Sequence, residues 1–259
     1  MTLFTSLLLV VNSFLHPATV PDIVSANDST EYAVFPNALV FEDSVRNLYT
    51  SIGLEEYSLS YQAFRYGMVG YFNLKQQGKL GAKKLISIID FTKPSSEKRF
   101  YTIDLEERVV KFHAYVSHGK NSGWNTVTSF SNVVHSNQSS LGFYITAETY
   151  VGSKGYSLKL DGQDMGYNNN MRERAVVMHE ADYVSESWIK KYGRLGRSQG
   201  CPALPREISR KVIDSIKNGT VIFAYAENQQ FLESSAHLNL KNIIQSQPMP
   251  TAISLQSFQ

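Results

Sequence analysis

The fold is decided by three neighbouring stretches of sequence, LISIIDF at 85–91, RFYTIDL at 99–105 and RVVKFHAYV at 108–116. All three are rich in β-branched and aromatic residues, which favour strands. In the third stretch, apolar and more polar side chains alternate, as in a strand with one buried face. The short Glu106-Glu107 connection predicts a hairpin between the second and third stretches. We therefore expect a β-sheet that begins at residue 85.

Further strands are expected downstream, and helices are expected on either side. The strand-like runs are GFYITAETYV (142–151), YSLKLDG (156–162), RAVVMH (174–179) and TVIFAYA (220–226). Before the sheet, one helical pattern ends at Gly53, and a second begins after a capping Ser60. The apolar face of the second helix is Phe64, Met68, Tyr71 and Phe72. After the cysteine, Pro205 suits a first helical position. The fold class is therefore mainly β with flanking helices (α+β), a twisted sheet or a sandwich.

After the amino-terminal residues 1–26, which are described below, the chain divides by composition into three parts. A linker and helical lead-in occupies 27–81, and the main domain occupies 82–230. Gln, Ser and Pro become prominent near the end, so 231–259 is predicted to be a loosely ordered tail. Inside the main domain, 117–141 is long, polar and rich in Ser and Asn. A loop of that length within a compact domain is often functional.

Composition excludes several classes of protein. The chain has 259 residues, of which 42% are hydrophobic and 19% are charged, as in ordinary globular proteins. The net charge of +2 provides no general attraction to nucleic acid. A single cysteine excludes an intrachain disulfide and a cysteine-cluster metal site. We found no HExxH motif, phosphate-binding loop or nucleotide fingerprint, so we expect neither a metal nor a cofactor.

The amino terminus has the character of an export signal. The apolar run LFTSLLLVVNSFL at 3–15 is shorter than the roughly 20 residues that span a bilayer. It suits the apolar core of a secretory signal, which we place at 1–26, although no basic residue precedes Arg46. No later stretch is apolar enough for a membrane span. These features predict an exported protein of the periplasm or cell envelope, and its oligomeric state is left open.

The strongest candidate for chemistry is Cys201, in RSQGCPALP at 197–205. Gly200 beside the thiol allows close approach of a substrate, and the amides of Gln199, Gly200 and Cys201 could face one oxyanion. Eight basic and only two acidic residues lie between 190 and 217. A positive surround favours the thiolate, which is the reactive form of cysteine. The alternative is a buried structural cysteine beside an ordinary basic helix.

A cysteine nucleophile needs a base, usually histidine. His179 ends the strand RAVVMH, 22 residues before Cys201, where a strand would deliver a side chain to a site. His118 and His135 fall in the long loop, and His113 falls in mid-strand. The remaining histidines are His16 in the signal and His237 in the tail.

Taken together, several motifs resemble the murein L,D-transpeptidase catalytic-domain family. They are IIDFTKPSSEKRFYTIDL, VSHGKNSG, SSLGFYITAETYVGSKGYSLKLDG, HEADYVS and GRSQGCPAL, in that order over roughly 40–227. The resemblance implies that Cys201 is the nucleophile and that His179 is its base and acid. It implies further that the backbone carbonyl of Glu180 orients the histidine, and it aligns Ser198 with the serine of the family's Ser-His-Gly-Cys motif. Gln199 stands where that motif has histidine, which puts hydrogen bonding to the substrate in doubt. Many relatives carry an arginine soon after the cysteine, and Arg206 is a weak substitute.

The implied activity is acyl transfer between peptidoglycan stem peptides, or hydrolysis of a stem if water replaces the acceptor amine. Two other classes stay open. A cysteine peptidase of wall peptides is disfavoured because its histidine would follow the cysteine. An inactive wall-binding module is favoured by Gln199 and opposed by the retained His179 and Cys201.

Overall fold

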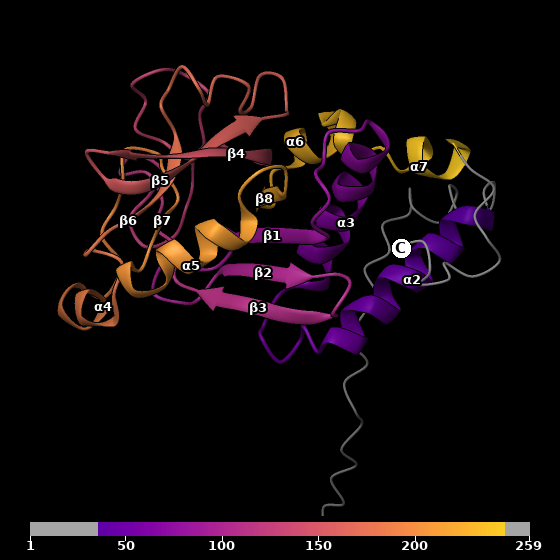
Figure 1. The fold of residues 1–259 in the computed structure, drawn as a ribbon, viewed down its shortest axis with the longest axis horizontal. Coiled ribbons are helices and arrows are strands. Elements are labelled where there is room, and N and C mark those ends of the chain that lie inside the picture. Colours follow the sequence, from indigo (N-terminus) through magenta and orange to yellow (C-terminus); the bar gives the residue numbers. More distant parts are fainter. Residues whose placement is uncertain (1–35, 247–259) are drawn as a thin grey trace, which may run out of the picture.

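The computed structural model describes residues 36–246, and the predicted signal peptide lies outside this range. Eight strands form one hydrogen-bonded sheet in the order β3-β2-β1-β8-β4-β5-β6-β7 (Figure 1). Neighbouring strands are antiparallel except for the pairs β1–β8 and β6–β7, which are parallel. The strand bounds are β1 Leu85–Asp90, β2 Phe100–Asp104, β3 Val109–Ala114, β4 Gly142–Gly152, β5 Gly155–Gly162, β6 Val177–Glu180, β7 Ala203–Leu204 and β8 Val221–Tyr225. The predicted class, mainly β with flanking helices, is confirmed.

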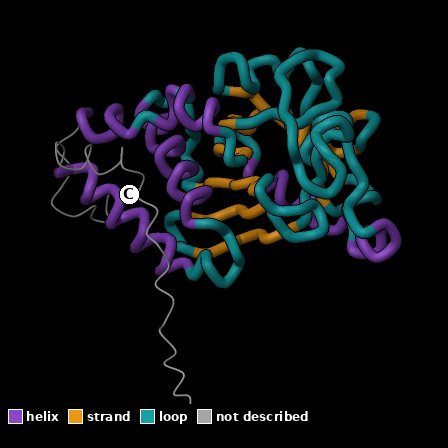
Figure 2. The backbone as a smooth tube through the Cα atoms, turned by 180° about the vertical axis from the view of Figure 1, so that it is seen from behind, coloured by secondary structure: helices purple, strands orange, loops and turns teal. Residues whose placement is uncertain are grey.

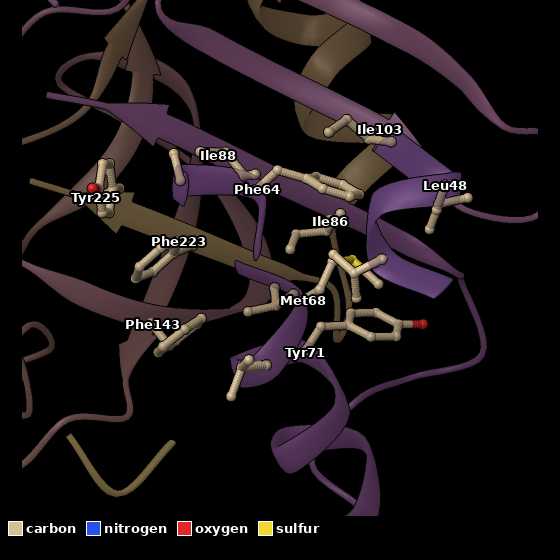
Figure 3. Packing of buried hydrophobic residues seen from close by; sticks show 14 of the residues in the cluster. Leu48, Phe64, Met68, Tyr71, Ile86, Ile88, Ile103, Phe143, Phe223 and Tyr225 are labelled. Atoms are coloured by element: carbon tan, nitrogen blue, oxygen red, sulfur yellow. The ribbon is translucent and has the colours of Figure 1, made fainter. Parts of the chain in front are cut away.

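Two helices precede the sheet. They are α2 (Pro36–Ile52) and α3 (Tyr61–Gln76), and Ser60 caps α3 by accepting a hydrogen bond from the amide of Ala63. Helix α3 packs against the strands, and α2 packs against α3. Figure 3 shows Phe64, Met68 and Tyr71 of α3 among Ile86, Ile88 and Phe223 of the sheet. Close approach depends on Gly70, because a Cβ atom there would lie 2.0 Å from the Phe143 ring. The apolar face predicted for this helix is therefore the face that packs against the sheet.

The stretch 231–246, predicted as part of a loose tail, is helical instead. It contains most of α6 (Gln229–Ser234), a 3-10 turn (Ala236–Leu238) and α7 (Leu240–Ser246). The buried side chains of Phe231, Leu240 and Ile243 join the same apolar core as α2 and α3. Burial of three widely spaced apolar residues outweighs the polar composition of this stretch.

A second core covers the other side of the strands. Helix α5 (Arg206–Ile216) buries Val212, Ile213 and Ile216 against strand residues such as Leu158 and Ile222. Besides the helices of 231–246, two further elements are not indicated by the sequence: the two-residue strand β7 and the short helix α4 (Glu186–Tyr192). Strand β7 is too short to show a pattern, and α4 has no buried residue to give it one.

Long loops lie over the strands on the side away from α2 and α3, as Figure 2 shows in teal. The segment 117–141 contains only isolated bridges, one of which pairs Gly119 with Ser198. This bridge places the long loop directly against the loop that carries Cys201. Within 36–246, no helix is both long and apolar enough to cross a membrane.

Candidate active site

Strand pairing brings the predicted histidine and cysteine to one edge of the sheet. His179 on β6 is paired in parallel register with Ala203 on β7, two residues after Cys201. The backbone amide of Val177, also on β6, lies 3.5 Å from Cys201 Sγ. The thiol in turn points to the carbonyl of Ala175 at 3.8 Å. The register of two short strands therefore positions the thiol beside the strand that carries the imidazole.

The imidazole of His179 is held in one tautomer. Its Nδ1 lies 2.7 Å from the carbonyl oxygen of Glu180, which can only accept a hydrogen bond. Nδ1 therefore carries the proton, and Nε2 keeps a free lone pair. Burial lowers the pKa of His179, and the nearby Lys154 lowers it further, while the Glu180 carbonyl opposes the shift. The side chain is therefore a neutral base at neutral pH, oriented by the carbonyl that the family resemblance implies.

The thiol of Cys201 is protonated at rest. Burial raises its pKa above the ordinary value, against the opposing effects of the Val177 amide, Arg174 and Lys154. Neither cation belongs to the basic run between 190 and 217. The cations with the largest effect on the thiol pKa therefore lie outside that run, and desolvation outweighs them. A thiol of this kind ionises when a base removes its proton, and His179 on the adjoining strand β6 is the candidate for that base.

Ser198 organises the turn that carries the cysteine. Its hydroxyl donates to the carbonyl of Cys201 at 2.6 Å and accepts from the amide of Gly200 at 3.0 Å. The Gly200 amide is thus already engaged, which leaves the amides of Gln199 and Cys201 as candidate oxyanion donors. The Gln199 side chain is exposed.

Gly200 is required by its surroundings. Its φ is +121°, a region that L-residues rarely adopt, and a Cβ atom would lie 2.7 Å from the carbonyl oxygen of Gln138. That carbonyl accepts a 2.6 Å hydrogen bond from Arg174 Nη2. Arg174 also donates through Nη1 to the carbonyl of Ser131 and the hydroxyl of Ser140. Arg174 therefore holds the 117–141 loop against residues 198–201, the turn that carries the candidate nucleophile (the nucleophile turn). No local sequence pattern indicates this role.

His118 is a structural residue and not a competing base. Its Nδ1 accepts from the fully buried guanidinium of Arg99 at 2.8 Å, and its Nε2 lies 3.4 Å from the Gly123 carbonyl. Burial, followed by the Arg99 charge, lowers the pKa of His118 to about 3. The basic lone pair is occupied, so His118 cannot accept a substrate proton. Its own carbonyl accepts from the Ser198 amide at 2.9 Å, which supports the nucleophile turn from behind.

The other candidates lie elsewhere. His135 is exposed, with a φ of +63°, and His113 stacks on Tyr101 with ring centroids 4.7 Å apart. His237 is buried beside the Gln163 carbonyl, and His16 lies outside the described residues. Arg206, the proposed substitute for the family arginine, pairs with Asp182 at 2.7 Å and is largely exposed.

A thiol on a segment that adjoins a strand bearing an oriented imidazole is compatible with nucleophilic cysteine catalysis. Comparison with known proteins gives a more definite classification. The family model described as L,D-transpeptidase catalytic domain matches residues 55–225, and the chain belongs to this family. No curated protein matches the chain.

Several solved structures are similar at low identity. An L,D-transpeptidase from Mycobacterium smegmatis is 14% identical, with 56% of this chain and 59% of that one covered and a TM-score of 0.35. L,D-transpeptidase 3 from Mycobacterium tuberculosis is 15% identical, with 56% of this chain and 62% of that chain covered and a TM-score of 0.33. The helical cell shape determining protein of Campylobacter jejuni is 10% identical, with 62% and 57% covered and a TM-score of 0.38. The matched region spans about three fifths of these proteins, and the family assignment rests on the match over 55–225.

Proposed function

We propose that the protein is a cysteine-dependent acyl transferase acting on peptidoglycan stem peptides, as an L,D-transpeptidase. The observation that carries this proposal is the hydrogen bond from His179 Nδ1 to the Glu180 carbonyl, on the strand that borders Cys201. It leaves a neutral Nε2 able to accept the thiol proton. Family membership supplies the substrate class.

In the first half of the reaction, His179 Nε2 takes the proton of Cys201, and the thiolate attacks the carbonyl carbon before a D-residue of the donor stem. The carbonyl oxygen becomes an oxyanion that the amides of Gln199 and Cys201 can stabilise. When the carbon–nitrogen bond breaks, the imidazolium returns its proton to the leaving amine. The product is a thioester on Cys201 and a free D-amino acid.

In the second half, an amine of an acceptor stem attacks the thioester while His179 removes its proton. The carbon–sulfur bond breaks, and the thiolate regains the proton from the imidazolium. The two stems are then cross-linked. Attack by water instead gives a shortened stem, so product identity separates a transpeptidase from a carboxypeptidase.

Action on the wall requires export. We propose that residues 1–26 are a signal peptide and that the mature protein acts in the periplasm or cell envelope, on the strength of the apolar run at 3–15.

The test is incubation of the purified protein with wall fragments and with a carbapenem, followed by mass spectrometry. We expect cross-linked or shortened stems and one covalent carbapenem adduct, both lost in Cys201→Ala and Cys201→Ser. His179→Ala should lower the rate by roughly 10²–10⁴-fold, whereas the exposed His135→Ala should leave it unchanged. Gln199→Ala should lose only part of the rate. A folded wild-type protein that forms neither product nor adduct would support the wall-binding module instead.

A further inference from the structure

Beside the nucleophile turn, an exposed tryptophan carries two arginines. Trp124 is 64% exposed, and the guanidinium carbons of Arg194 and Arg197 lie 3.8 and 4.6 Å from its ring centroid. Both distances are within the range of cation–π attraction. In the part of the chain that the structure describes, no carboxylate forms an ion pair with either arginine. Two like charges are therefore held together on one ring without an opposing charge.

Backbone carbonyls fix the two guanidiniums in place. Arg197 Nη1 donates to the carbonyls of Lys120 and Gly123 at 2.9 and 3.0 Å, and Arg194 Nη1 donates to the carbonyl of Leu195 at 2.6 Å. Among residues 36–246, no acceptor contacts Nη2 of either arginine, and the buried Nε of Arg194 has no partner. Burial, followed by the Arg197 charge, lowers the pKa of Arg194. Both guanidiniums are thus held through Nη1, each keeps an Nη2 donor that is unpaired among the described residues, and each lies beside a second cation, a combination that favours a bound anion.

This arginine pair is physically continuous with the candidate active site. Arg197 directly precedes Ser198, whose hydroxyl donates a hydrogen bond to the Cys201 carbonyl. Ser198 also forms a β-bridge with Gly119, which belongs to the loop that carries Trp124. Three residues lie between Arg197 and Cys201, so the Cα atoms of Arg197 and Cys201 are at most about 14 Å apart. An extended tetrapeptide has the same reach. The Cα atom of Arg197 therefore lies within the reach of a stem peptide bound at the thiol.

We propose that Trp124, Arg194 and Arg197 form a subsite for a carboxylate of the stem peptide whose carbonyl reacts at Cys201. The choice of ligand rests on the proposed function, whereas the anion-binding chemistry rests on the side chains themselves. A carboxylate accepts paired hydrogen bonds from guanidinium donors and relieves the repulsion between the two cations. A free phosphate shares this chemistry, but it is not tethered to the reacting carbonyl.

The protein contains its own reporter, because Trp124 and Trp188 are its only tryptophans. In a Trp188→Phe, Cys201→Ala protein, Trp124 is the sole indole and no turnover occurs. We would titrate this protein with a synthetic tetrapeptide stem with free carboxylates, with the same stem fully amidated, and with inorganic phosphate. We expect a saturable fluorescence change with the free-carboxylate stem and an affinity at least tenfold weaker for the amidated stem. Arg194→Gln should weaken binding of the free stem roughly tenfold. Lys190→Gln removes the same charge from an exposed lysine of α4 and should leave binding unchanged.

Three results would overturn the subsite: equal affinity for the free and amidated stems, saturation by phosphate but not by the stem, or equal effects of Arg194→Gln and Lys190→Gln. Circular dichroism of each variant verifies that the fold is retained. Binding is measured without catalysis, so the result is independent of the wall-product assay. A protein that is active on wall fragments but shows no carboxylate-dependent binding refutes the subsite alone. A protein that binds the stem but makes no product refutes the proposed activity alone.

Discussion

Substitution of Gly200 by alanine tests whether the exact position of the nucleophile turn matters. The added Cβ atom would lie 2.7 Å from the carbonyl oxygen of Gln138, whereas ordinary contacts begin at 3.4 Å. Relief of the contact requires a displacement of about 0.7 Å between the nucleophile turn and the 117–141 loop. The loop cannot move freely, because Arg174 donates to the same carbonyl at 2.6 Å. The turn that carries Cys201 must therefore absorb much of the shift.

Two magnitudes follow from this geometry. A displacement near 1 Å in a catalytic group costs on the order of 10²-fold in rate, so we expect carbapenem acylation of Gly200→Ala to slow roughly 10- to 100-fold. Because a φ of +121° strains an alanine, Gly200→Ala should also lower the free energy of unfolding by about 1–3 kcal/mol. The rate is measured by the time course of the covalent mass shift, and stability is measured by denaturant unfolding.

Gly78→Ala is the matched control. Gly78 has a φ of +67°, but a Cβ atom there would meet nothing within 4 Å, at the end of α3. This variant also places alanine at a positive φ, with less strain than at +121° and without the steric contact, so it should lose a little stability and keep the wild-type acylation rate. Acylation of Gly200→Ala at the wild-type rate would refute the argument that Gln138 and Gly200 together position the thiol.

Three further outcomes are expected. Lys154→Met removes a cation that lowers the pKa of the Cys201 thiol, so the pH midpoint of alkylation of Cys201 by iodoacetamide should move upward. An unchanged midpoint would contradict this electrostatic role of Lys154. Because burial lowers the pKa of His118 to about 3, its contribution to stability is complete above pH 6.5 and is lost progressively as the pH falls toward 3. As the pH falls through that window, the free energy of unfolding should therefore fall by up to about 1.4 kcal/mol per pH unit. In His118→Asn the amide oxygen can still accept from Arg99 but does not titrate, so the free energy of unfolding should depend less steeply on pH. Ser198→Ala removes two hydrogen bonds from the nucleophile turn, so acylation should slow roughly tenfold while the melting temperature changes little. Acylation at the wild-type rate would show that the turn keeps its shape without these two hydrogen bonds.

Local sequence was sufficient for most of the elements. Strand β3 shows the expected alternation, with Ala114 buried and Val109 and Lys111 exposed, because side chains of a strand point to opposite faces. Helix α3 begins after Ser60 and buries the predicted aromatic face, because capping and 3.6-residue periodicity are local properties. The segment 231–246 was mispredicted, because its few apolar residues gain their burial only from contact with distant helices.

The candidate site was likewise predictable from the sequence only in part. Cys201 and His179 were candidates from the sequence, because a glycine beside a thiol and a histidine at a strand end are local features, and the family resemblance implied their roles. The tertiary structure alone decided which charges act on them. The eight basic residues near Cys201 in sequence do not govern its pKa, whereas Arg174 and Lys154, which are remote in sequence, lie close enough to influence it. Electrostatic interaction and desolvation depend on distance and burial in three dimensions, and neither quantity follows from sequence separation.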